Sequence, residues 1–191
     1  MTPSKKKIRE ITGFTFDKQG RDPENWFNIA RSFYEAAILL NSSSKNSPSI
    51  PYYYNAGLSI ELLLKAIILS KHKSFKIDHN LVQLSKDSGA NLTKDQEHTL
   101  KLLSEIIIWR GRYPIPKTKG QWNNYMDVIL EKHIVKERAG NTHRTLVHRG
   151  RFPSIENYKK IWNICEIEYK NQHNNSLQRR LVPLAPAEFK C

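Results

Sequence analysis

The feature that most constrains the fold is a long, nearly uninterrupted apolar segment at residues 53–70. Its apolar positions surround a helical projection instead of forming one stripe, which is typical of a helix buried among other helices. These positions are Leu58, Ile60, Leu62, Leu63, Leu64, Ala66, Ile67, Ile68 and Leu69. Glu61 and Lys65 lie four residues apart in the order that favours an ion pair on a helix. We therefore predict a central buried helix in which these two charges are structural.

Other segments carry apolar residues at three- to four-residue spacing, the pattern of one helix face. Asp22 followed by Pro23 marks one helix start, and Thr93 with Gln96 forms a capping box for another. Further helices are expected at 81–88, from 122 to about 137, and from 155 onwards, while strand-like alternation is confined to residues 12–16. The pattern predicts an all-α fold, an up-and-down helical bundle of five to six helices.

The composition along the chain divides it into three parts. Residues 1–21 are basic and expected to be poorly ordered, residues 22–172 form the helical domain, and residues 173–191 form a C-terminal tail. A Ser- and Asn-rich loop is expected at 41–48. A chain of 191 residues is long enough to bury one core without disulfides or metals.

Charge and cysteine content narrow the function classes. The 31 Lys and Arg residues outnumber 18 Asp and Glu residues, giving a net charge of +13 that attracts polyanions such as nucleic acid. The two cysteines, Cys165 and Cys191, cannot build a disulfide framework or a four-cysteine zinc site. Because no segment is apolar over a membrane-spanning length and no signal-peptide core follows the basic start, we expect a cytoplasmic protein with no membrane association.

The richest polar segment is residues 136–151, which contains four arginines and two histidines. Over residues 131–160, eight Lys or Arg stand against three Glu. A neutral imidazole can accept a proton from a ribose hydroxyl near neutral pH, and guanidinium groups can stabilise the phosphate transition state. This route needs no metal. The alternative is that these histidines are solvated or capping residues in a basic loop.

The remaining histidines and cysteines favour structural roles. His72, His79, His98 and His133 are dispersed and show no metal-ligand spacing, so no metal site is predicted. His133 and Cys165 fall on apolar stripes, which predicts a packed core histidine and a buried thiol.

Two helical segments point to a known family. The segment 56–66, Ala-Gly-Leu-Ser-Ile-Glu-Leu-Leu-Leu-Lys-Ala, followed by Asp78-His79-Asn80-Leu81, resembles the HEPN superfamily over about residues 26–169. The segment 109–116, with Trp109, Gly111, Arg112, Tyr113, Pro114 and Pro116, resembles a feature of one HEPN-like subgroup. The resemblance implies a helical bundle that dimerises and that, in many members, is a metal-independent ribonuclease of toxin–antitoxin, phage-defence or CRISPR-associated systems.

The signature of those ribonucleases is an Arg followed, after four to six residues, by a His. Arg138 and His143 have four residues between them, whereas Arg144 and His148 have three but lie in a phrase closer to the family's context. The expected catalytic residues are, in order, His148, Arg144, His143 and Arg138. The expected RNA phosphate-binding residues are Arg149, Arg151, Arg110 and Arg112. The implied reaction is attack by the ribose 2′-hydroxyl without a cofactor, which leaves a 2′,3′-cyclic phosphate.

The resemblance leaves other functions open. Some members bind without cutting, so a non-catalytic helical RNA-binding or protein-interaction module is the alternative. A toxin masked by an antitoxin or defence-system partner protein is a third hypothesis. The expected partners are RNA, with tRNA as one candidate, and a second copy of the chain. The position of the Arg-His segment discriminates between these functions. If it lies in a shared basic cleft at a two-fold interface, the nuclease is favoured.

Overall fold

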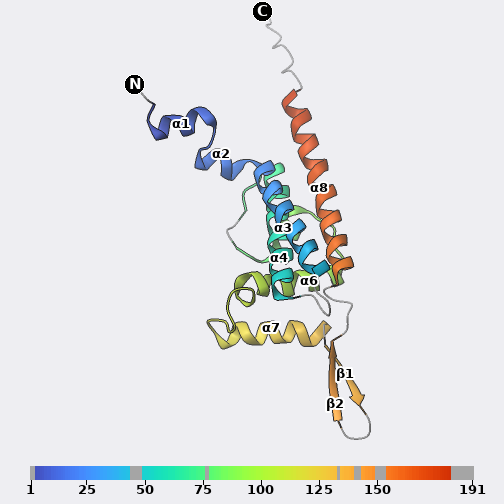
Figure 1. Cartoon of the computed structure of the whole chain (residues 1–191). Helices are drawn as coiled ribbons and strands as arrows, with labels where there is room; N and C mark the ends of the chain where they lie inside the picture. Colours follow the sequence, from blue (N-terminus) through green and yellow to red (C-terminus); the bar gives the residue numbers. More distant parts are fainter. Residues whose placement is uncertain are drawn as a thin grey trace, which may run out of the picture.

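Helix α4 (Ile50–Ser70) runs through the centre of the bundle in the computed structural model (Figure 1). The structure describes the backbone of residues 3–43, 49–75, 78–132, 134–139, 143–148 and 154–181, and the side chains of residues 3–42, 49–75, 78–130 and 154–175. Ile60, Leu63, Leu64 and Ile67 are fully enclosed. The prediction of a central buried helix is therefore confirmed.

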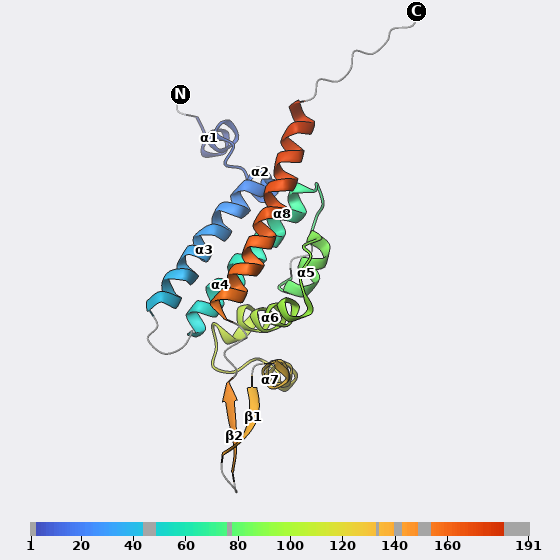
Figure 2. The same cartoon turned by 90° about the vertical axis from the view of Figure 1, so that its right-hand side faces the viewer.

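The long helices α3 (Pro23–Ser43) and α8 (Ile155–Leu181) lie along α4, while α5 (Leu81–Ser88) and α6 (Lys94–Glu105) cover another side of it (Figure 2). The predicted capping box of Thr93 and Gln96 is complete, and Asn80 caps α5 because its Oδ1 accepts from the Gln83 N–H at 3.0 Å. The α3, α6 and α8 side chains that complete the core include Ala30, Ala37, Leu100, Leu103, Tyr158, Ile161 and Cys165. The all-α bundle is confirmed.

Helix α6 continues into a π-helical segment, η1 (Ile106–Arg110), which packs closely against α4. Two glycines permit this approach. A Cβ at Gly57 would lie 2.5 Å from Ile107 Cγ2, and a Cβ at Gly111 would overlap the Tyr54 ring. The close packing therefore fixes where η1 and the loop after it lie.

Helix α7 (Lys119–Lys132) lies across the end of the bundle, and an antiparallel hairpin of β1 (Ile134–Ala139) and β2 (His143–His148) projects beyond it (Figures 1 and 2). The helix expected to reach residue 137 thus ends at Lys132. The reason is that β-branched residues, which favour strands, occur on both sides of Gly140 in the sequence.

The terminal segments also differ from expectation. Residues 5–21, expected to be poorly ordered, contain α1 (Lys5–Thr12) and α2 (Phe16–Arg21), capped by Ser4 and Thr15. Thr12 ends α1 and Gly13 closes it with φ 77°, so the strand suggested for 12–16 is absent from that described stretch. Helix α8 continues to Leu181, past the expected domain boundary at 172. Among the described residues, no helix is long and apolar enough to cross a membrane.

Candidate functional site

The four residues expected to be catalytic lie on the β1–β2 hairpin, where a helix and loop were expected. Arg138 pairs across the strands with Arg144, Ala139 with His143, and Ile134 with His148. The register therefore brings the two arginines of the two candidate Arg-His pairs directly opposite each other. Arg149 and Arg151 lie outside the described residues.

The strand period decides which of these residues share a face. Residues two or four apart on one strand, and residues paired across strands, lie on the same face of the ribbon. Arg144 and His148 therefore share a face with Arg138 and Lys136, whereas His143 lies on the opposite face. The strictly spaced pair Arg138–His143 is split between the two faces.

The hairpin also sets the distance between Arg144 and His148. At about 3.3 Å per residue, the Cα atoms of Arg144 and His148 are about 13 Å apart along β2. On a helix the same four-residue separation would place them one turn apart, about 6 Å. Within one hairpin, Lys136, Arg138 and Arg144 therefore share a face, but His148 lies four residues along β2 from Arg144.

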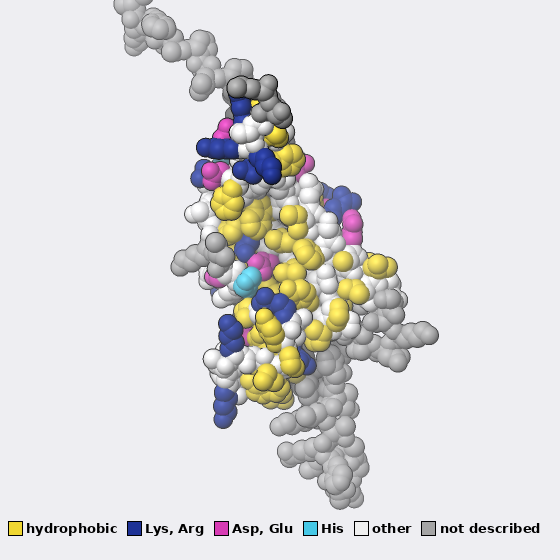
Figure 3. All heavy atoms as spheres, turned by 60° about the vertical axis from the view of Figure 1, so that its left-hand side comes forward, with side chains coloured by type: hydrophobic (Ala, Val, Ile, Leu, Met, Phe, Trp, Pro, Cys, Tyr) yellow, Lys and Arg dark blue, Asp and Glu magenta, His cyan; other side chains and the backbone are white. Residues whose placement is uncertain are grey.

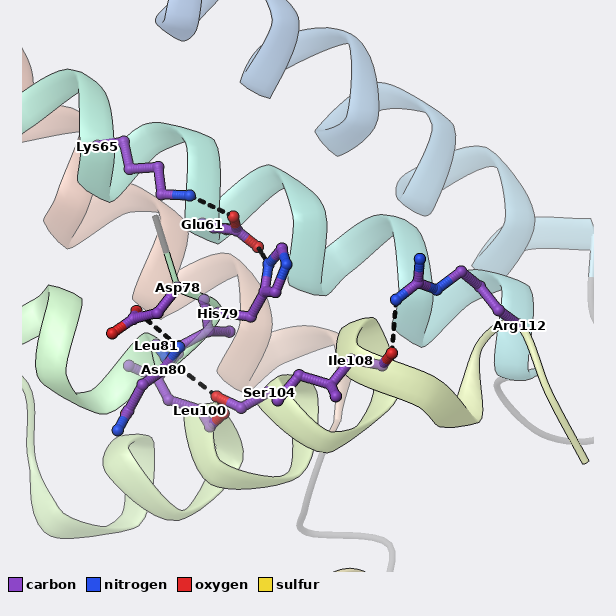
Figure 4. A network of polar contacts seen from close by, with 10 residues as sticks. All are labelled: Glu61, Lys65, Asp78, His79, Asn80, Leu81, Leu100, Ser104, Ile108 and Arg112. Carbon is purple, nitrogen blue, oxygen red and sulfur yellow. Dashed lines mark hydrogen bonds and ion pairs between the residues drawn. The ribbon is translucent and has the colours of Figure 1, made fainter. Parts of the chain in front are cut away.

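Arg110 and Arg112 lie at the end of η1 and in the loop after it. Arg110 Nη1 donates to the Pro114 carbonyl at 3.2 Å and its guanidinium lies over the Trp109 ring, which turns it back onto the protein. Arg112 is exposed, and its Nη2 donates to the Ile108 carbonyl at 2.5 Å (Figure 4). Of the two, Arg112 is the more exposed.

A buried ionic cluster ties the segment before α5 to α4. Glu61 Oε1 accepts from Lys65 Nζ at 2.5 Å, and Glu61 Oε2 lies 2.9 Å from His79 Nδ1 (Figure 4). The Glu61 and Lys65 side chains are 5% exposed, while that of His79 is 47% exposed. The predicted ion pair is confirmed. The sequence did not indicate that His79 joins it.

The segment before α5 is also held by hydrogen bonds between side-chain oxygens and backbone N–H groups. Asp78 Oδ1 accepts from the Asn80 N–H at 3.1 Å, and the Leu81 N–H donates to Ser104 Oγ at 3.0 Å (Figure 4). These bonds satisfy the first turn of α5, whose N–H groups have no partner within the helix. The cluster and the turn therefore position α5 against α4 and α6, which is a structural role.

The buried thiol and phenol groups are unreactive near neutral pH. Burial raises the pKa of the Cys165 thiol to about 12, and nearby Glu168 adds to the shift. Burial likewise raises the pKa of Tyr158, with the Ser59 hydrogen bond at 2.7 Å opposing the shift. Because a thiol with such a pKa stays protonated near neutral pH, Cys165 is a packing residue, as its apolar stripe predicted.

The surface of the described residues combines cations with apolar side chains. On the face seen in Figure 3, hydrophobic side chains form a broad patch, and Lys and Arg side chains occur near its upper end and again in its lower half.

A metal centre was also considered for the site. Among the described residues, no group of three or more His, Cys, Asp or Glu could hold a metal ion.

Comparison with known proteins gives a family match. The family model described as HEPN domain matches residues 23–139, which is more than half of the chain and includes α3, α4, Arg110, Arg112 and Arg138. His143, Arg144 and His148 lie beyond the matched range. No curated protein and no solved structure matches significantly.

Proposed function

The chain belongs to the HEPN family, and from this premise we propose that it is an endoribonuclease that cleaves RNA by 2′-hydroxyl attack without a metal. The observation that supports this proposal is the hairpin register, which gathers Lys136, Arg138, Arg144 and His148 on one ribbon face. Cations beside an imidazole are the groups that phosphodiester transfer requires.

In the proposed reaction, a histidine accepts the proton of the ribose 2′-hydroxyl while the 2′-oxygen attacks the adjacent phosphorus. Arginine donors stabilise the added negative charge on the phosphate oxygens. The bond from phosphorus to the 5′-oxygen then breaks, and a protonated histidine donates a proton to that oxygen. The products are a 2′,3′-cyclic phosphate and a 5′-hydroxyl, so DNA is not a substrate.

A second copy of the chain completes the proposed site. The separation of about 13 Å between Arg144 and His148 is long for two groups that act on one phosphate. Two hairpins related by a two-fold axis present each other's histidines and arginines, so a homodimer can assemble what one chain keeps apart. We also propose that the chain acts in a toxin–antitoxin or defence system, in which a partner protein masks the site.

A non-catalytic RNA-binding module is the second candidate, and the projection of the hairpin favours it. A two-stranded ribbon with basic residues on one face can contact a nucleic-acid backbone directly. Such binding needs neither the two-fold assembly nor the histidines. Affinity then falls steeply with salt concentration but is insensitive to loss of His143 and His148.

The test compares the wild-type chain with the His143→Ala/His148→Ala double variant. Total tRNA, a labelled RNA oligomer and a DNA oligomer of the same sequence are incubated with each protein in EDTA. We expect RNA cleavage by the wild type, loss of at least about 100-fold of that rate in the double variant, and no DNA cleavage. His98→Ala, a histidine substitution on α6, is the matched control.

The outcomes separate the candidates. Equal cleavage by both proteins would remove these histidines from the mechanism. RNA binding without cleavage by either protein would favour the binding module. The single variants His143→Ala and His148→Ala then show which face of the ribbon the reaction uses, because the two residues lie on opposite faces.

A further inference from the structure

The N-terminal segment, residues 4–21, presents large apolar side chains that the bundle does not cover. Ile8 is 44% exposed, Ile11 72%, Phe14 67% and Phe16 93%, and no residue of α1 or α2 is buried. The segment lies at the end of the bundle opposite the hairpin, so it is separate from the residues proposed above for catalysis (Figures 1 and 2). Exposed apolar side chains gathered in this way mark a contact surface for another molecule.

Capping groups and a contact with α3 fix the conformation of the N-terminal segment. Ser4 caps α1 and Thr15 caps α2, each with a side-chain oxygen that accepts from a backbone N–H. On α3, Trp26 Nε1 donates to the Gly20 carbonyl at 2.9 Å and so ties the end of α2 to the bundle. The segment is therefore formed before it meets a partner, and little ordering cost is added when it binds.

Helix α1 has one apolar face with cations on both of its sides. Ile8 and Ile11 share that face, because residues three apart are neighbours on a helix. At about 100° per residue, Lys7 lies on one side of this pair, and Lys5 and Arg9 lie on the other. A helix that lies in the interface of a bilayer has this arrangement, since its apolar face enters the acyl boundary while its cations meet the headgroups.

The charge of the N-terminal segment matches an anionic lipid surface. Six cations stand against Glu10 and Asp17, which gives a net charge of +4; the cations are Lys5, Lys6, Lys7, Arg9, Lys18 and Arg21. None of the ion pairs within the described ranges involves these six side chains. A nucleic-acid backbone also attracts cations, but it would leave the aliphatic Ile8 and Ile11 in water. A bilayer surface takes up both the charge and the apolar side chains.

We propose that the N-terminal segment binds the surface of an anionic lipid bilayer, with its exposed Ile and Phe side chains at the acyl boundary and its Lys and Arg side chains on the headgroups. The expectation of no membrane association rests on the lack of a spanning segment and of a signal-peptide core. Neither property bears on a short helix that lies on a bilayer. The proposal goes beyond the ribonuclease proposed above and does not rest on it.

The test is co-sedimentation of the full chain with lipid vesicles. One set of vesicles is phosphatidylcholine alone, and the other is three parts phosphatidylcholine to one part phosphatidylserine, each at low and high salt. The Ile11→Ala/Phe16→Ala variant removes apolar side chains that the bundle does not use. Leu39→Ala/Ile167→Ala is the matched control, because both of its apolar side chains are similarly exposed but lie on α3 and α8.

We expect the wild type to bind the anionic vesicles at least about tenfold more tightly than the neutral ones, and less tightly at high salt. Ile11→Ala/Phe16→Ala should weaken that binding at least about tenfold and leave RNA cleavage unchanged. Lys5→Gln/Lys7→Gln should also weaken it about tenfold. Its control, Lys159→Gln/Lys160→Gln, removes the same charge from exposed positions on α8 and should have no effect, as should the apolar control.

Absence of wild-type binding to the anionic vesicles overturns the proposal. Equal binding by the wild type and Ile11→Ala/Phe16→Ala overturns it too, because attraction would then come from the charge of the whole chain. The same variant is tested for affinity to a labelled RNA and, by analytical ultracentrifugation, for self-association. If it loses one of these in place of vesicle binding, the segment contacts RNA or a second copy of the chain, and the bilayer is refuted.

Discussion

Helix α4 and the β1–β2 hairpin use charge in opposite ways. Helix α4 holds one Glu and one Lys, both 5% exposed and paired with each other, with His79 against the second carboxylate oxygen of the Glu. The hairpin holds three cations and a histidine on one face of a ribbon that projects beyond the bundle. A charge in the interior must be paired to be tolerated, whereas an excess of cations attracts a polyanion. In α4 the charges therefore position elements, and for the hairpin we propose that they serve binding.

Breaking the α4 ion pair should have the largest effect on stability. Lys65→Met leaves the Glu61 carboxylate buried with only His79 beside it, and we expect a loss of about 3 kcal/mol in the free energy of unfolding. Urea denaturation measures it. Arg31→Met on α3 is the matched control, because its pair with Glu35 is exposed and contributes about 0.5 kcal/mol or less. Equal effects from the two variants would mean that burial does not decide the value of the pair.

Alkaline pH should also act on the bundle. Because the pKa of Cys165 is raised from 9.0 to about 12 in the folded state, the unfolded chain loses its proton first. The associated stability is complete below pH 9 and is lost as pH rises through 12, about 2 kcal/mol of it between pH 9 and about pH 11.

Urea unfolding across this pH range is compared with the Cys165→Ala variant, which should lack this component. Tyr53 and Tyr169, whose pKa values burial raises to about 12, should leave a residual decline above pH 10 in both proteins. Identical pH profiles for the two proteins would contradict the assigned role of the thiol.

The contact between α4 and η1 should tolerate no added methyl group. Gly57→Ala places a Cβ 2.5 Å from Ile107 Cγ2, and overpacking of this kind costs about 1–3 kcal/mol. Gly120→Ala, on α7, is the control, because the nearest atom to its added Cβ is 3.8 Å away. We expect the control to be neutral or slightly stabilising in thermal unfolding. A neutral Gly57→Ala would mean that η1 can move away from α4.

Hairpin substitutions should have the smallest effect on stability and the largest on RNA binding. Arg138→Ala and Arg144→Ala should change the free energy of unfolding by about 0.5 kcal/mol or less. Each should lower the slope of log affinity against log salt concentration by about one. Anisotropy with a labelled RNA at several salt concentrations measures the slope, with Arg31→Ala as control. A slope that does not change would place RNA binding elsewhere on the chain.

Local sequence signals predicted the bundle well for physical reasons. Caps at Asn80, Thr93 and Ser154 involve side chains within three residues of the N–H groups that they satisfy, so their pattern is visible in sequence. The apolar segment of α4 likewise required burial on all sides. The hairpin was missed because its alternation is irregular, although β-branched residues on both sides of Gly140 are a hairpin signal.

By itself, the sequence determined the helical bundle, its central helix, the Glu61–Lys65 pair and the basic character of residues 131–160, because these depend on composition and on neighbours within one or two helical turns. Only the tertiary structure placed His79 on Glu61, 18 residues away, and set the strand register that groups Arg138 with Arg144. These features arise where separate elements meet, and no local pattern specifies the distance or the burial that results.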